Sequence, residues 1–151
     1  MKNSDRFIKL GAPVSDTTAS LRFFGDDLDP DAISVLLGAS PTSSARKGEI
    51  WINSRGVKRT ARTGRWLLEA VRSQPGDLDN QLVELLSPLT QDIEVWRSLV
   101  AQFSGDIFCG LFMEEGNEGV ELRAETLVMI GARGLSLGFD IYSGGLDLGG
   151  R

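Results

Sequence analysis

Seven basic residues and one tryptophan gather between residues 46 and 65, and they carry the most evident binding chemistry of the chain. The cations are Arg46, Lys47, Arg55, Lys58, Arg59, Arg62 and Arg65, and Trp51 lies among them. Glu49 is the single anion of this segment. Cations interleaved with aromatic side chains are typical of surfaces that bind phosphate groups or single-stranded nucleic acid. The alternative is a solvated basic loop whose tryptophan packs into the core.

The charge of the chain is uneven along its length. The net charge is −5, but residues 1–75 carry +4 and residues 76–151 carry −9. Such asymmetry is typical of proteins that contact nucleic acid or an acidic partner, and also of two halves that pack through complementary charges. The acidic half repels a long polyanion unless the charges segregate in space. For the basic segment we therefore favour a solvated loop first, a small anion or acidic partner second, and nucleic acid third.

The sequence contains no histidine, and this excludes several classes of active site. Ser-His-Asp and Cys-His nucleophiles, imidazole metal sites and a histidine acid or base cannot be built. Cys109 is the single cysteine, which excludes a disulfide within the chain and fits a reducing cytoplasm. It lies in the apolar run DIFCGLFM, where we expect a buried, unreactive thiol.

Carboxylates are the remaining candidates for acid and base chemistry. Glu69 and Asp140 lie on predicted strands, but nothing in the spacing of the 21 acidic residues singles them out. Asp27, Asp29 and Asp31 repeat the first three ligand positions of an EF-hand loop. Alanine and glycine occupy its sixth and twelfth positions, where a calcium loop needs glycine and glutamate. We expect no catalytic residue, no metal and no cofactor, and we favour a function other than catalysis.

The elements that position these residues begin with a strand and a helix. Alternating apolar and polar residues predict a half-buried strand over residues 17–24. Asp29 is placed to cap the next helix, Pro30 suits its first turn, and Gly38 suits a left-handed end. Helix capping therefore explains the acidic run better than metal binding does.

The basic segment follows this helix and leads into the second half of the chain. Within it, residues 49–53 form either a short strand or an irregular loop pinned by Trp51. Further elements are expected as a strand over residues 65–71, helices over 78–87 and 93–103, strands over 106–113 and 120–123, a helix over 125–132 and a strand over 135–142. The strand over 106–113 is apolar enough to be buried on both faces or nearly so.

The element order β-α-β-β-α-α-β-β-α-β predicts an α+β fold. We expect a single domain over residues 17–142, with a mostly antiparallel mixed sheet and helices packed on one face. Residues 1–16 are expected to be a loosely ordered lead-in, and residues 143–151 a flexible glycine-rich tail. No apolar run approaches the roughly 20 residues of a membrane span, and the N-terminus lacks the apolar stretch of a signal peptide. We therefore expect a cytoplasmic protein without membrane contact.

Three segments resemble a known family. They are LRFFGDDLDPDAISVLLGASPTSSARKGE (residues 21–49), Gly64-Arg65-Trp66 and LSLGFDIY (residues 135–142), and they resemble the bacterial domain-of-unknown-function family 4279. The leucine-rich central helix and the short helix before the last strand follow in the same order, so the resemblance covers nearly the whole chain. It implies the same fold and a bacterial, cytoplasmic setting. It brings no reaction, substrate or active site.

These observations lead to one expected function and two alternatives. We expect a non-enzymatic interaction module that binds a macromolecular partner, as immunity and accessory proteins do, through a protein partner or through self-association. The first alternative is a small-anion binder or enzyme that uses residues 46–65, and the second is nucleic-acid binding. A deep pocket that joins Arg46, Lys47 or Arg59 to a carboxylate favours ligand chemistry. A flat face of cations without a cleft favours the interaction module.

Overall fold

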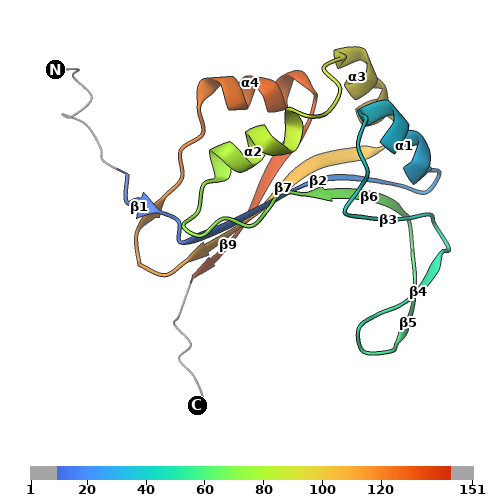
Figure 1. The fold of residues 1–151 in the computed structure, drawn as a ribbon, viewed down its shortest axis with the longest axis horizontal. Coiled ribbons are helices and arrows are strands. Elements are labelled where there is room, and N and C mark those ends of the chain that lie inside the picture. Colours follow the sequence, from blue (N-terminus) through green and yellow to red (C-terminus); the bar gives the residue numbers. More distant parts are fainter. Residues whose placement is uncertain (1–9, 144–151) are drawn as a thin grey trace.

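A five-stranded sheet with helices on one face organises the computed structural model, which describes residues 10–143 (Figure 1). The strand order is β3-β6-β2-β7-β9. Neighbouring strands are antiparallel except β7 and β9, which are parallel. This mixed, mostly antiparallel sheet with helices on one side confirms the predicted α+β class.

The two longest strands lie next to each other in the sheet. They are β2 (Asp16–Gly25) and β7 (Ser104–Met113), with ten residues each. The flanking strands are β6 (Gly64–Glu69) and β3 (Ser43–Ala45) on one side and β9 (Ser136–Ser143) on the other. Edge strand β3 is therefore short, whereas edge strand β9 has eight residues.

The helices of the described chain are α1 (Pro30–Leu37), α2 (Leu78–Leu86), α3 (Ile93–Gln102) and α4 (Ala124–Ala132). Helix α1 begins and ends as predicted. The Asp29 carboxylate accepts a hydrogen bond from the Asp31 N–H at 3.0 Å, and Gly38 adopts a φ of +76° at the C-terminal end. No helix within residues 10–143 has the length and apolar character needed to cross a membrane.

Three aromatic side chains form the centre of the core between the sheet and the helices. Phe23 lies 6.3 Å from Trp66 and 6.4 Å from Trp96 between ring centroids, and all three are fully buried. The buried indole groups have acceptors, since Trp66 Nε1 donates to Ser34 Oγ at 3.0 Å and Trp96 Nε1 donates to the Thr90 carbonyl at 2.8 Å. The core therefore gains aromatic burial without leaving an indole N–H unpaired.

Strand β7 is buried on the face toward the helices and only partly buried on the other, so the prediction of burial on both faces or nearly so is met in full on the helix side only. Ile107, Cys109 and Leu111 face the helices and are buried. Phe108 and Phe112 point to the opposite side and are only partly buried. The reason is that the helices pack on one face of the sheet (Figure 1). We call the other side the open face.

The prediction of a strand over residues 120–123 is wrong. The short strand in this region is β8 (Glu118–Gly119), which pairs in parallel with β1 (Ala12–Pro13). The partner offers only two residues, so the chain leaves the pairing before Val120. Val120 and Leu122 instead pack as irregular segments against the core.

Some elements lie where the sequence shows no clear pattern. Residues 50–52 form a strand, β4 (Ile50–Ile52), which decides between the two alternatives for this segment. Strands β3 and β5 (Lys58–Thr60) were not predicted, because each has three residues and neither has an alternating apolar pattern.

The ends of the described chain also differ from the prediction. Part of the predicted lead-in is structured, since β1 lies within it and both Val14 and Asp16 are buried. Ser143, the first residue of the predicted tail, ends β9. The rest of the lead-in and of the tail lies outside the described residues.

Candidate functional site

The basic segment forms a β-hairpin that projects away from the sheet near β3 and β6 (Figure 1). Strands β4 and β5 pair antiparallel, with Trp51 opposite Arg59. The pairing continues through backbone hydrogen bonds of 2.8 Å that join Ala61 to Gly48 and to Glu49. We call residues 48–62 the basic arm.

Local hydrogen bonds hold the tip of the basic arm. The Asn53 side-chain oxygen accepts hydrogen bonds from the N–H groups of Arg55 at 2.9 Å and Val57 at 3.0 Å. Gly56 has a φ of +74°, a left-handed conformation that glycine adopts without steric cost. The turn therefore has a defined shape, and it sets where the cations of the arm lie.

Two of the seven cations form ion pairs with aspartates that lie just before α1 or in its first turn. Arg46 donates to Asp29 at 2.7 Å and to Asp31 at 2.9 Å, and Lys47 donates to Asp26 at 2.7 Å. These hydrogen bonds lower the pKa values of Asp29 and Asp26. The pairs tie the base of the arm to α1, so we assign Arg46 and Lys47 a positioning role within the fold.

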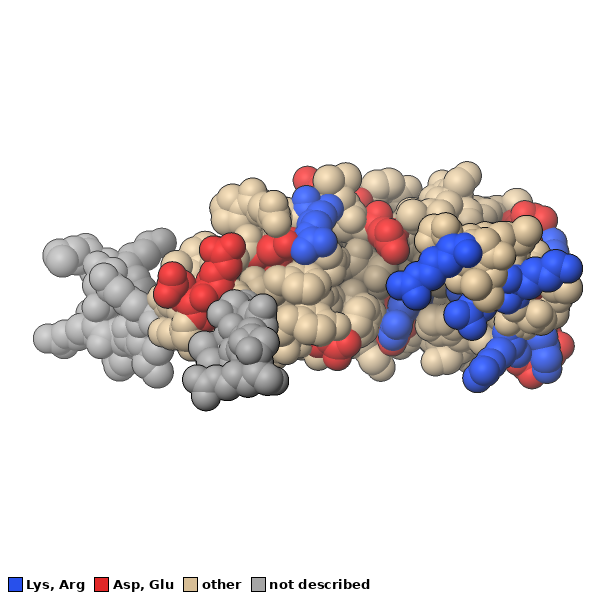
Figure 2. All heavy atoms as spheres, turned by 90° about the horizontal axis from the view of Figure 1, so that it is seen from below, with Lys and Arg blue, Asp and Glu red and all other residues tan. Residues whose placement is uncertain are grey.

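Four other cations of the segment are exposed and make no ion pair with any residue from 10 to 143. They are Arg55, Lys58, Arg59 and Arg62. In Figure 2, which views the open face, Lys and Arg side chains gather at the end of the molecule that carries the arm, and Asp and Glu prevail at the other end. On this face, the charge asymmetry of the sequence is therefore also a separation in space.

An open groove of about 300 Å³ lies at the base of the arm. Its lining includes two aromatic and three basic side chains: Phe24, Trp51, Arg59, Arg62 and Arg65. The Arg65 guanidinium lies 4.8 Å from the centre of the Trp51 ring, a cation–π contact. Its Nε atom is buried and has no hydrogen-bond partner among the described residues. The groove thus combines positive charge that no described carboxylate neutralises with an aromatic wall.

The groove differs from both arrangements expected from the sequence. It contains Arg59, but Arg46 and Lys47 are absent from its lining, and none of its lining residues is a carboxylate. An acid or base to assist a reaction on a bound anion is therefore missing from these walls. The geometry suits binding of an anionic group more than its chemical conversion.

The carboxylates considered for acid and base chemistry are not brought together. Glu69 lies on β6 and Asp140 on β9, and two strands separate them. Three strand spacings amount to about 14 Å, which exceeds the reach of a cooperating carboxyl pair. Within residues 10–143, no cluster of acidic or cysteine side chains is arranged to hold a metal ion.

Cys109 is fully buried in β7, as expected from the sequence. Burial raises the pKa of its thiol to about 12. The thiolate is the reactive form of cysteine, and it is scarcely populated at neutral pH under these conditions. Cys109 is therefore a core residue.

Sequence reasoning missed a cluster around Arg22 at the centre of the open face, in which one arginine contacts a carboxylate and two aromatic rings. Arg22 on β2 donates to both carboxylate oxygens of Asp106 on β7, at 2.8 and 2.7 Å. Its guanidinium also lies 4.5 Å from the Phe108 ring centre and 5.3 Å from that of Phe24. The period-two pattern of β2 could have shown this face, because Arg22 and Phe24 alternate with the buried Leu21 and Phe23.

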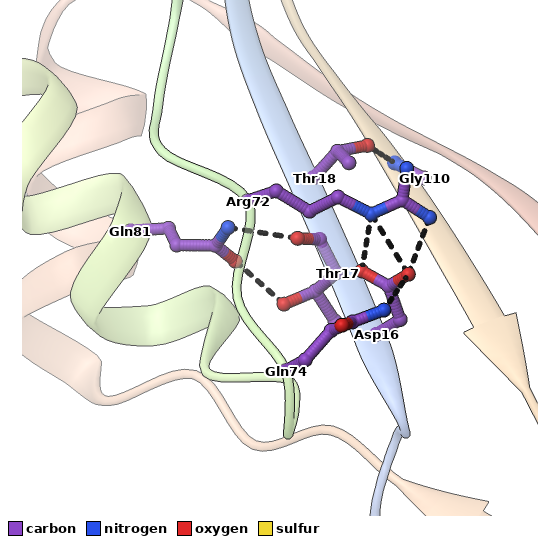
Figure 3. A network of polar contacts seen from close by, with 7 residues as sticks. All are labelled: Asp16, Thr17, Thr18, Arg72, Gln74, Gln81 and Gly110. Atoms are coloured by element: carbon purple, nitrogen blue, oxygen red, sulfur yellow. Dashed lines mark hydrogen bonds and ion pairs between the residues drawn. The ribbon is translucent and has the colours of Figure 1, made fainter.

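A second cluster lies at the start of β2 and fixes the segment that leads into α2 (Figure 3). Arg72 and Gln74 both donate to the Asp16 carboxylate, and the Arg72 hydrogen bonds lower the pKa of Asp16. Beside it, Thr17 Oγ1 donates to Gln81 Oε1 at 2.6 Å, and Gln81 Nε2 donates to the Thr17 carbonyl at 2.8 Å. These groups satisfy one another, so we assign them to the fold.

The fold and its basic arm define a class of protein: an α+β domain covered by helices on one face, with a cationic hairpin at one end. The sequence model described as Domain of unknown function (DUF4279) matches residues 15–144. The chain therefore belongs to this family, as its sequence resemblance indicates. Comparisons with curated proteins and with solved structures give no significant match.

Proposed function

We propose that the protein is a non-enzymatic interaction module, active in the bacterial cytoplasm, whose basic arm binds an acidic surface of a protein partner. The observation that carries this proposal is the set of four exposed cations on a projecting hairpin without ion pairs to other described residues. Exposed cations of this kind raise the rate of encounter with an acidic surface and select against basic ones.

The arm also offers apolar contact area. Ile50, Ile52 and Val57 are exposed on the same hairpin, and Trp51 is half-buried at the groove. Interfaces combine such apolar and aromatic anchors with arginine, because charge alone gives little affinity once water and salt compete. The arm therefore has the composition of a protein-binding surface.

Charge elsewhere on the molecule favours a protein partner over nucleic acid. Asp140 is exposed on the open face, and Glu114 and Glu115 are exposed where β7 ends. A nucleic-acid strand that left the arm along the open face would meet these carboxylates. An acidic patch on a folded partner can be confined to the arm.

The test is co-purification from the native host with charge-reversed arms. We expect the variant Arg55→Glu, Lys58→Glu, Arg59→Glu, Arg62→Glu to lose the partners that the wild type retains. The control pair is Arg59→Glu against Arg97→Glu, since Arg97 is also exposed but lies on α3. Identical recovery by wild type and the fourfold variant would show that the arm is not the binding surface.

A second measurement separates protein from nucleic acid. Trp66 and Trp96 are fully buried, so a change in tryptophan fluorescence on binding reports on Trp51. We expect an acidic polypeptide to change this emission and an oligonucleotide of equal charge to bind more weakly at the same ionic strength. Tighter binding of the oligonucleotide, with a steep loss of affinity as salt is added, would favour nucleic acid instead.

The groove supports a second candidate function, the binding of a small anion. The supporting observation is the lining by Arg59, Arg62 and Arg65 without a carboxylate. Calorimetric titration with inorganic phosphate and with citrate tests it, with Arg65→Gln as the variant. Absence of heat with both anions would leave the groove as part of the protein-binding surface.

A further inference from the structure

Strand β9 leaves one edge of the sheet open over eight residues. Among residues 10–143 it pairs only with β7, so its other side presents free backbone groups. Proteins protect such edges with proline, lysine, bulges or short strands. Strand β9 contains neither proline nor lysine, and its single charge is Asp140. The opposite edge, β3, is protected by its length of three residues.

Large apolar side chains are exposed along this edge. Phe139, Ile141 and Tyr142 have 42%, 64% and 47% of their surface exposed. Phe139 and Ile141 lie on the helix side of the sheet, whereas Tyr142 stacks on Phe112 on the open face at 4.9 Å. A further strand that pairs with this edge would cover these apolar side chains on both faces of the sheet.

A second copy of β9 fits this edge in one register. In an antiparallel pair, residues directly opposite each other point their side chains to the same face of the sheet. A two-fold axis between two copies of β9 must therefore pass between one residue and the same residue of the other copy. Only axes at Phe139 and at Asp140 pair seven residues of each eight-residue strand. The axis at Asp140 sets two carboxylates directly opposite each other, which is unfavourable. The axis at Phe139 remains.

The register centred on Phe139 is complementary on both faces. On the helix side, Phe139 meets its own copy and Leu137 meets Ile141. On the open face, Asp140 lies opposite Gly138, where an added side chain would meet open space. Charge and shape therefore agree on this register, with no carboxylate opposite a carboxylate.

We infer that two copies of this protein associate through antiparallel pairing of their β9 strands, in the register centred on Phe139. The product is a continuous sheet of ten strands, five from each copy. The basic arm follows β3, at the opposite edge of the sheet from β9. Both arms therefore stay free at the outer ends of the dimer. Self-association through β9 is a separate property from the partner binding proposed above.

Cysteine cross-linking tests the register directly. In Phe139→Cys the two new thiols face each other across the axis, within the Cα separation of about 4.4–6.8 Å that a disulfide needs. In Ile141→Cys the two thiols lie four residues apart along the strands, about 13 Å. Cys109 does not interfere, because it is buried in β7.

Under mild oxidation we expect Phe139→Cys to form a covalent dimer and Ile141→Cys to stay largely monomeric. Equal cross-linking of the two variants would overturn the register. Light scattering of the unmodified protein across a range of concentrations tests the association itself. A monomer at every concentration would overturn the proposal, whereas a dimer that Ile141→Lys dissociates would support it. Loss of the dimer in the fourfold arm variant would also contradict it, because the arm lies away from β9.

Discussion

Six of the seven cations of the basic segment divide into two groups according to whether they pair with a carboxylate. Arg46 and Lys47 are paired with the aspartates at the start of α1, and the exposed cations of the arm are not paired with described residues. The residue type is the same in both groups, but the neighbours decide the role. The same reasoning applies to Asp16 and Thr17, whose partners make them structural.

Asp16 makes the stability of the fold depend on pH in the acid range. Its pKa is lowered from the ordinary value of 3.8 because Arg72 donates hydrogen bonds to the carboxylate. A lowered pKa in the folded state gives a contribution that is complete above the unfolded value and is lost as the pH falls through the folded one. We expect Asp16→Asn to lower the urea midpoint near neutral pH, and the difference from wild type to shrink below pH 3.8. A difference that stays constant with pH would exclude this role.

Thr17 provides a prediction for a buried hydroxyl. Thr17→Val keeps the shape of the side chain but leaves Gln81 Oε1 and the Asp77 N–H without their partner. We expect a loss of about 1–3 kcal/mol in the free energy of unfolding, measured by urea denaturation. The control is Thr60→Val, the same change at an exposed position of β5, for which we expect less than about 0.5 kcal/mol. Equal effects of the two variants would mean that the hydroxyl of Thr17 has no special role.

At the scale of elements, glycines at helix ends have opposite roles in α1 and α4. Gly38 ends α1 with a φ of +76°, whereas Gly131 lies within the last turn of α4 without a positive φ. An added Cβ would meet no atom within 4 Å at either position. Backbone conformation alone should therefore decide the effect of alanine.

We expect Gly38→Ala to lower the free energy of unfolding by about 1–2 kcal/mol, because alanine is strained in the left-handed region. Gly131→Ala should raise it by about 0.5–1 kcal/mol, because alanine loses less backbone entropy in a helix. Thermal denaturation of the two variants measures both signs. A stabilised Gly38→Ala variant would contradict the argument.

Elements with a local signal could be predicted from the sequence. Helix α1 has an aspartate cap and a glycine end, and β2 alternates between apolar and polar residues, so both were found. Strands β3 and β5 could not be found, because their pairing depends on partners distant in the sequence or across a turn. The sequence identified the individual cations of the site. It could not reveal the groove, because the groove brings together Phe24 of β2 and residues of the arm that are distant in the sequence.

At the scale of the whole molecule, the sheet places the two proposed binding surfaces at opposite edges. The basic arm lies beyond β3, and the free strand β9 lies at the other edge. The helices pack on one face of the sheet (Figure 1), and among residues 10–143 neither edge strand pairs with a further strand on its outer side. The proposed partner binding and the proposed self-association are therefore compatible with each other.

Two arms on one dimer should produce avidity toward a surface that carries many copies of an acidic partner. We expect Ile141→Lys, which disrupts β9 pairing, to bind a dense immobilised partner about 100-fold more weakly than the wild type, because the second contact of a dimer is intramolecular. The same variant should bind a monomeric partner in solution with unchanged affinity per arm. The comparison of surface and solution formats separates this effect from a direct contact. If Ile141→Lys loses affinity equally in both formats, β9 itself is the partner site, because avidity requires an array and a direct contact does not.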